Sequence, residues 1–255
     1  MLRFTANLSL LFNETELIDR FQAASEQGFS AVEIQFPYTL PAQQIQTKLA
    51  ANRLQLILFN VDADDLMQGG EGLTCVPEKR AAFQTAVAQT VAYAEKLKPA
   101  VINVLPGRCL NENRREEYMR TFKENLAYAL KAFSSLGIKT VFEAVNTYDM
   151  PGFLIHSGQQ MLEILNQLNN PMLAMQYDIY HMTMMGENPT EFINQHGVNI
   201  GHIQFADSPG RGQPGTGAID FGQLFSVIEN SNYSGWLGAE YKPVGKTEDS
   251  FTWFQ

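Results

Sequence analysis

The stretch EEYMRTFKENLAYALKAFSSLGIKTVFE, residues 116–143, joins an amphipathic segment to a short apolar one. In the first segment apolar side chains recur at three- and four-residue spacing, which is typical of one face of a helix: Met119, Phe122, Leu126, Leu130 and Phe133. The pattern stops at Gly137, as helices often do. Residues 138–143 then form a compact apolar run, which predicts a strand buried on both faces.

The same alternation of strand and helix patterns occurs eight times along the chain. The predicted strands are residues 2–7, 31–36, 54–60, 100–105, 138–143, 173–178, 199–205 and 235–240. The chain has 255 residues, and an eight-stranded α/β barrel usually has roughly 250. We therefore predict a single (β/α)8 TIM barrel as the one domain of residues 1–255, with an open doubly wound sheet as the alternative.

Composition narrows the classes of partner and compartment. The net charge of −9 argues against a nucleic-acid partner, and no apolar run approaches the ~18 residues that span a membrane. The N-terminal sequence MLRFTANLSLLFNETE has no pattern of a signal peptide. Cys75 and Cys109 have no metal-site spacing and are typical of free thiols in a reducing cytoplasm. We expect a cytoplasmic protein, and its oligomeric state stays open.

Four predicted strands end on an oxygen-bearing side chain that interrupts an apolar run. They are TVFEA (140–144), AMQYD (174–178), GHIQFAD (201–207) and LGAEY (237–241), with the polar side chains Glu143, Asp178, Gln204 and Glu240. In a barrel, the ends of four consecutive strands converge on one point, and clustered buried carboxylates need a cation. Because all four ligands are oxygens, the set predicts one divalent metal ion, Mg²⁺ or Mn²⁺. The alternative is four ordinary polar residues that cap helices or form ion pairs.

Other polar residues near these strand ends are candidates for substrate contacts. We assign this role to His181, which follows Asp178 by three residues, and to Arg211 and Lys242 in the last two loops. His202 precedes Gln204 by two residues, so it is expected one layer deeper on the same strand face. The remaining candidates are weaker: His156 and His196 are interpreted as structural, and Asn7 and Glu33 stay undecided.

Two loops on the same side of the predicted barrel are also unusual. Residues 61–77 lack a helical period, and residues 206–219 are rich in Gly and Pro. Loops this long are often functional, and both follow the carboxyl ends of strands, where barrels place their chemistry.

With these motifs in place, the chain resembles the hydroxypyruvate isomerase family of the xylose-isomerase-like barrels. The resemblance runs nearly end to end and is carried by QYDIYHM (176–182), GHIQFADSPGRGQPGTG (201–217) and GAEYKP (238–243). It implies that Glu143 and Glu240 are a catalytic pair that moves a proton through an enediolate and also binds metal with Asp178 and Gln204. The implied reaction interconverts hydroxypyruvate and tartronate semialdehyde, with a small 2-oxo or hydroxy acid as substrate.

Several rival functions stay open at this point. A closely similar subgroup isomerises 2-oxo-tetronate, and related ketose 3-epimerases use the same glutamate pair on neutral sugars. Those epimerases usually have His where this chain has Gln204. An apurinic endonuclease on this fold would want a histidine-rich zinc cluster, whereas the chain has four histidines. A non-catalytic metabolite-binding barrel would not need both glutamates.

Overall fold

The computed structural model describes residues 1–254 and forms a closed barrel of eight parallel strands. The strands are β1 (Phe4–Asn7), β2 (Ala31–Ile34), β3 (Gln55–Asn60), β4 (Val101–Asn103), β5 (Lys139–Glu143), β6 (Leu173–Asp178), β7 (Ile200–Phe205) and β8 (Leu237–Ala239). Each strand pairs with its sequence neighbours, and β1 also pairs with β8. The predicted barrel is confirmed, and the open sheet is excluded because β8 closes onto β1.

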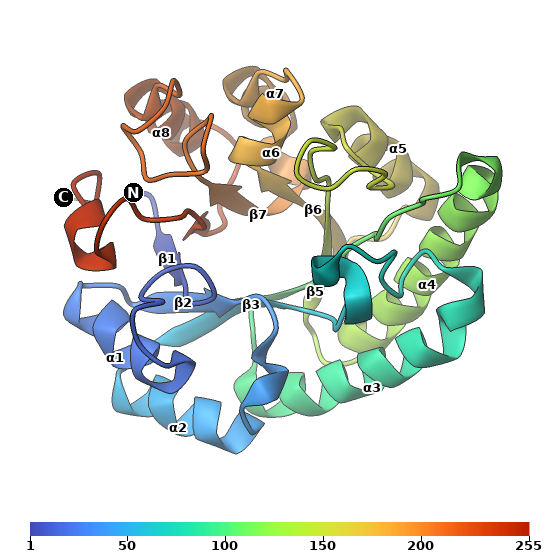
Figure 1. The fold of residues 1–255 in the computed structure, drawn as a ribbon, viewed down its shortest axis with the longest axis horizontal. Coiled ribbons are helices and arrows are strands. Elements are labelled where there is room, and N and C mark those ends of the chain that lie inside the picture. The colour runs from blue at the N-terminus through green and yellow to red at the C-terminus, as the bar shows by residue number, and fades with distance from the viewer. Residues whose placement is uncertain (255) are drawn as a thin grey trace.

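Helices surround the barrel on its outside (Figure 1). They are α1 (Leu17–Glu26), α2 (Ala42–Ala51), α3 (Arg80–Leu97), α4 (Arg115–Ser134), α5 (Gly158–Leu168), α6 (Ile179–Met184), α7 (Pro189–His196) and α8 (Phe221–Asn230). In α4 the predicted stripe is largely buried, with Phe122, Leu126, Leu130 and Phe133 in the core. Within residues 1–254, no helix is long and apolar enough to cross a membrane.

The connection from β6 to β7 holds two helices, α6 and α7, whereas no α-helix follows β8 in the part of the chain that the structure describes. Instead, the C-terminal segment lies beside the start of the chain, between α8 and α1 (Figure 1). Phe254 stacks on Phe29 with ring centroids 4.4 Å apart, and Trp253 contacts Phe4 and Phe205 edge-on. Aromatic packing thus covers the strands where an eighth outer helix would otherwise lie.

Some predicted strands extend past the observed ones at their carboxyl ends. β2 ends at Ile34 rather than at residue 36, β4 ends at Asn103 rather than at 105, and β8 ends one residue before Glu240. Phe36 and Leu105 remain apolar because they line a cavity at the mouth of the barrel instead of continuing the ladder. Hydrophobicity alone cannot distinguish these two roles.

The two unusual loops are ordered by carboxylates. In residues 61–77, Asp65 accepts from the main-chain N–H of Gly72 (2.9 Å) and pairs with Lys79 (3.0 Å). In residues 206–219, the buried Asp207 carboxylate accepts main-chain N–H groups, including those of Gly215 (2.9 Å) and Gly217 (2.8 Å). Both loops therefore have a defined shape above the strand ends.

Candidate active site

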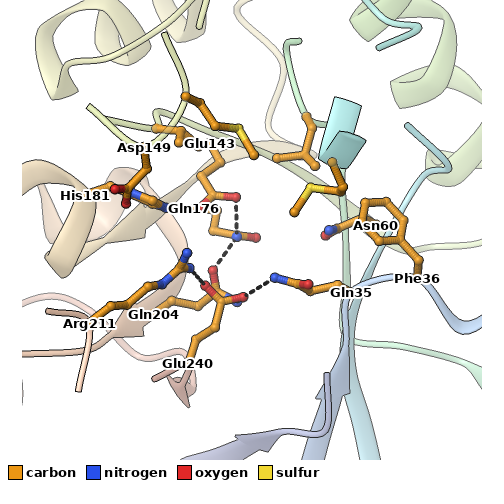
Figure 2. A pocket seen from close by; sticks show the side chains of 14 residues that line it. Gln35, Phe36, Asn60, Glu143, Asp149, Gln176, His181, Gln204, Arg211 and Glu240 are labelled. Carbon is orange, nitrogen blue, oxygen red and sulfur yellow. Dashed lines mark hydrogen bonds and ion pairs between the residues drawn. The ribbon is translucent and has the colours of Figure 1, made fainter. Parts of the chain in front are cut away.

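A cavity of about 110 Å³ opens at the carboxyl ends of the strands, and most of the predicted site residues surround it (Figure 2). Glu143 ends β5, Asp178 ends β6, Gln204 lies near the end of β7, and Glu240 follows β8. Asp178 is in register with Gln204, which places the two side chains on adjacent strands at one level. All four side chains are buried. The structure thus gathers the four predicted ligands at one end of the barrel.

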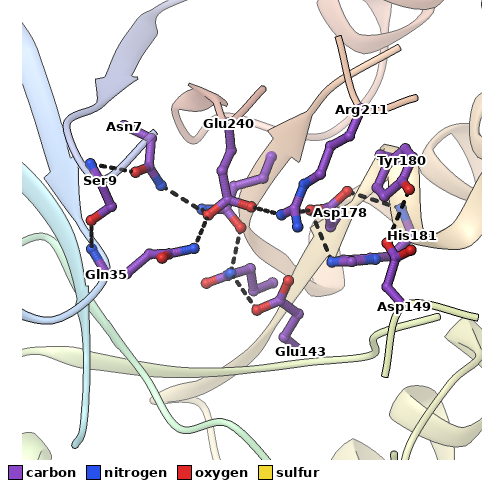
Figure 3. A network of polar contacts seen from close by, with 12 residues as sticks. Asn7, Ser9, Gln35, Glu143, Asp149, Asp178, Tyr180, His181, Arg211 and Glu240 are labelled. Carbon is purple, nitrogen blue, oxygen red and sulfur yellow. Dashed lines mark hydrogen bonds and ion pairs between the residues drawn. The ribbon is translucent and has the colours of Figure 1, made fainter. Parts of the chain in front are cut away.

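Glu240 is surrounded by hydrogen-bond donors on both carboxylate oxygens (Figure 3). Its Oε1 accepts from the side-chain amides of Asn7 (2.9 Å), Gln35 (2.9 Å) and Gln204 (3.2 Å). Its Oε2 forms an ion pair with Arg211. Burial raises the pKa of Glu240 to about 7, and the charge of Arg211 limits that rise.

Glu143 has donors on only one of its two oxygens. Its Oε2 accepts from the amides of Gln176 (2.8 Å) and Asn103 (3.1 Å), while no donor among residues 1–254 meets Oε1. Burial raises the pKa of Glu143 well above 4.5, and the charges of Glu240 and Asp178 raise it further. Amide N–H groups require an acceptor, so a proton held by Glu143 belongs on Oε1, the oxygen without a donor.

Arg211 is the one cationic side chain that lines the cavity, and it lies between two carboxylates. It pairs with Glu240, and its Nη2 is 3.8 Å from Asp178 Oδ2. The guanidinium also lies over the ring of Tyr180, 5.4 Å from the ring centroid. Arg211 lies in the loop that Asp207 orders, which fixes the position of its main chain. Only 19% of its side chain is exposed. The charges of the buried carboxylates attract this cation and raise its pKa, although burial itself opposes the charged form.

The position of His181 follows from the geometry at the start of helix α6. Asp178 caps α6 by accepting the main-chain N–H of His181 (3.0 Å), which places His181 in the first turn beside the cavity. The Asn146 side-chain oxygen accepts two main-chain N–H groups, so its amide nitrogen must donate to His181 Nδ1 (2.7 Å). The hydrogen of the neutral ring is therefore on Nε2. Burial lowers the pKa of His181 to about 4, which keeps the ring neutral at pH 7.

The arrangement fits a divalent cation. Glu143, Asp178 and His181 each offer a ligand atom, and these atoms lie within 4.8 Å of one another. The tautomer just derived places hydrogen on His181 Nε2, which makes that nitrogen a donor rather than a ligand. Gln204 Nε2 donates to Glu33 (2.6 Å), so its carbonyl oxygen points away from Glu33 and accepts from Gln176 (2.6 Å). Buried carboxylate and amide oxygens are the donor set that Mg²⁺ and Mn²⁺ prefer.

Sequence reasoning missed several residues that shape the cavity. The side-chain amides of Gln35, Asn103 and Gln176 donate to the two glutamates, and Asp149 lines the cavity beside His181. A signal did exist for Gln176: it is the first polar residue in LAMQYD, two before Asp178, and alternate strand residues face the same side.

The remaining predicted residues lie outside the cavity. Lys242 has an exposed side chain, and its main-chain N–H donates to the carbonyl of Arg211 (2.7 Å), so its proposed substrate contact stays a prediction. His202 lies one layer deeper, as expected, and its Nε2 is 2.7 Å from Glu33. His196 packs on Phe192 at the outer helix α7.

Comparisons with known proteins identify relatives over the whole length. Residues 21–255 match the model of the family described as xylose isomerase-like TIM barrel. Hydroxypyruvate isomerase of Escherichia coli is 40% identical, over 99% of this chain and 98% of its own length. A 2-oxo-tetronate isomerase of Pectobacterium atrosepticum is 36% identical, over 99% of this chain and 97% of its own length.

A solved structure of a related protein has the same fold. The crystal structure titled AP endonuclease, family 2, from Brucella melitensis superposes with a TM-score of 0.95 at 35% identity, covering 100% of this chain and 98% of that one. These matches confirm the resemblance found in the sequence motifs. The chain belongs to the xylose isomerase-like TIM barrel family, and within it to the group that contains hydroxypyruvate isomerase and 2-oxo-tetronate isomerase.

Proposed function

We propose that this protein is a metal-dependent isomerase that interconverts hydroxypyruvate and tartronate semialdehyde. The observation that carries the proposal is the pair of buried glutamates, Glu143 and Glu240, at one small cavity with a single arginine beside them (Figure 3). Its curated relatives with 36–40% identity carry isomerase names, which supports the same reaction class.

Glu143, Asp178, Gln204 and Glu240 would hold the metal, in line with their convergence and oxygen chemistry. When bound, a divalent cation would supply Lewis-acid stabilisation of negative charge on neighbouring substrate oxygens. The charges agree in sign, because three of the four proposed ligands are buried carboxylates, which need a cation to balance them.

The side chains of this protein would divide the remaining work. Arg211 would turn from Glu240 to the substrate carboxylate, which frees Glu240 Oε2 to exchange a proton with carbon. Glu143 would exchange its proton through Oε1, the oxygen that no amide occupies. One glutamate removes the proton from C3 and the other delivers one to C2, through an enediolate, while the hydroxyl proton of O3 passes to O2, so that the substrate neither gains nor loses a proton overall. His181 would donate from Nε2 to a substrate oxygen.

Two of the rival functions differ from this proposal in substrate. A 2-oxo-tetronate isomerase would use the same residues on a four-carbon acid, and this substrate is the second candidate because of the 36% identical relative. A ketose epimerase acts on a neutral sugar, which gives Arg211 no carboxylate to bind.

An endonuclease is poorly supported by the site geometry. Of the four histidines, His181 alone lines the cavity, and the described residues hold a single group of three close metal-ligating side chains. A cluster of several zinc ions needs more ligands than that. We also propose a cytoplasmic location, which the two free buried cysteines support.

The decisive experiment compares kcat/KM for hydroxypyruvate and 2-oxo-tetronate with Mg²⁺ and with Mn²⁺. We expect hydroxypyruvate to be the better substrate. Higher kcat/KM for the four-carbon acid would transfer the assignment to that substrate. Turnover of neither acid would refute the proposal and leave a binding protein.

A further inference from the structure

Glu33 and two glutamines form a directed chain of hydrogen bonds beneath the cavity. Glu33 is fully buried on β2, and its Oε1 accepts from the side-chain amides of Gln204 (2.6 Å) and Asn7 (3.0 Å). Asn7 cannot turn over, because its own side-chain oxygen accepts the main-chain N–H of Ser9 (2.9 Å). The nitrogen of each amide therefore faces Glu33.

The direction imposed by Glu33 passes to the next glutamine. With its nitrogen toward Glu33 and Glu240, Gln204 presents its Oε1 to Gln176, whose Nε2 donates to it at 2.6 Å. The same Nε2 donates to Glu143 Oε2 at 2.8 Å. If the Gln176 amide turned over, its oxygen would face two acceptor oxygens at hydrogen-bond distance, which is repulsive.

The chain ends on an acceptor that has no donor. Gln176 is 1% exposed, and its Oε1 is buried without a hydrogen-bond partner among residues 1–254. Figure 2 shows this oxygen on the cavity side of the amide, pointing toward the wall that carries Gln35 and Asn60. An unsatisfied buried acceptor is costly, so a ligand that brings a donor to this point gains affinity.

We propose that Gln176 is a specificity-determining residue whose Oε1 accepts a hydrogen bond from the substrate hydroxyl next to the carbonyl, and that Glu33 fixes its orientation. This inference rests on the proposed function for the identity of the substrate. It adds a requirement that the glutamate pair does not impose, namely a hydroxyl donor on the ligand.

Binding to paired ligands tests the role of Gln176. Hydroxypyruvate and pyruvate differ by one hydroxyl, and calorimetry would measure Kd for each on Mn²⁺-loaded protein carrying Glu143→Gln, so that the ligand is not converted. We expect hydroxypyruvate to bind about tenfold more tightly than pyruvate, as one neutral hydrogen bond allows. Gln176→Leu should lose this preference because its Kd for hydroxypyruvate rises while its Kd for pyruvate stays unchanged. The control Gln160→Leu, which removes a hydrogen bond to His156 N on the outer helix α5, should retain it.

The outcomes separate the inference from the proposed function. Equal Kd values for the two ligands before any change at Gln176, or equal weakening of both by Gln176→Leu, would overturn the inference even if the enzyme isomerises hydroxypyruvate. A retained preference in a protein without turnover would support the inference and refute the isomerase. If Gln176→Leu does not fold, equal Kd values for hydroxypyruvate and pyruvate on the protein that retains Gln176 would still overturn the inference.

Glu33→Gln tests the orienting role, because a glutamine at residue 33 can donate as well as accept. We expect it to reduce the hydroxyl preference, and the double variant with Gln176→Leu to show no further loss. An unchanged preference in Glu33→Gln would remove Glu33 from the proposal.

Discussion

Replacing Glu143 by glutamine separates proton transfer from hydrogen bonding with little structural disturbance. Glu143 accepts from Gln176 and Asn103 on Oε2 alone, so the oxygen of a glutamine can accept both bonds and place its NH₂ at Oε1. That NH₂ cannot accept a carbon-bound proton or deliver one at neutral pH. A positioned general acid or base contributes 10²–10⁴-fold, which corresponds to about 2.7–5.5 kcal/mol of activation free energy.

The assay combines isomerisation rate with deuterium exchange at C3, with Mg²⁺ saturating throughout. We expect Glu143→Gln to lose at least about 10²-fold in kcat while its melting temperature stays close to that of the unmodified protein. Glu240→Gln should also lose activity, but with a lower melting temperature, because its NH₂ would face Arg211. If glutamine at residue 143 also blocks C3 exchange, Glu143 is the C3 base; if exchange continues, it is the C2 donor. Near-normal turnover in both variants would refute the paired-glutamate reaction.

Four further changes have defined outcomes. Chelation should abolish isomerisation and added Mg²⁺ or Mn²⁺ should restore it; full turnover in metal-free protein would contradict the metal site. Arg211→Ala should raise KM for hydroxypyruvate by roughly 10- to 150-fold, as the loss of a charge-assisted hydrogen bond of about 1.5–3 kcal/mol predicts. Because burial lowers the pKa of His181 from 6.5 to about 4, the metal-free fold should be stabilised by this group above pH 6.5 and lose about 3 kcal/mol as pH falls toward 4. Urea unfolding should show a shallower pH dependence for His181→Gln. Gly238→Ala should lower the melting temperature sharply, since its Cβ would lie 2.5 Å from Glu33 Oε2; an unchanged melting temperature would show that Glu33 can move.

The barrel and the convergence of four oxygen-bearing side chains at its mouth could be predicted because both depend on periodicity. Strands buried on both faces have an apolar pattern, and a polar residue at the end of such a run is conspicuous. Glu143 and Asp178 are clear examples, since each is the last residue of its strand. The C-terminal aromatic segment has no comparable period, so the packing of Trp253 and Phe254 against β1 and β7 was not predicted.

The hydrogen-bond donors around the glutamates could not be predicted for a different reason. Gln35 and Asn103 lie at the ends of two different strands, and no spacing in the sequence distinguishes an amide that faces a carboxylate from one that faces solvent. Their orientation depends on which neighbour can only accept, and that neighbour is known only after the barrel has closed. Glu33 illustrates this, because its partners His202 and Gln204 are 169 and 171 residues away in the chain.

The two glutamates consequently differ in a way that their sequence contexts do not reveal. Glu240 receives three amide donors and an arginine, whereas Glu143 receives two amide donors on a single oxygen. Each amide that donates to a carboxylate oxygen favours its ionised form, and burial favours the protonated form. Burial raises the pKa of Glu240 to about 7, where Arg211 limits the rise, and it raises the pKa of Glu143 well above 4.5, where the charges of Glu240 and Asp178 add to the rise. A pair that must remove one proton and deliver another needs two different environments, and here they arise from the arginine and the amide donors placed around two chemically identical side chains.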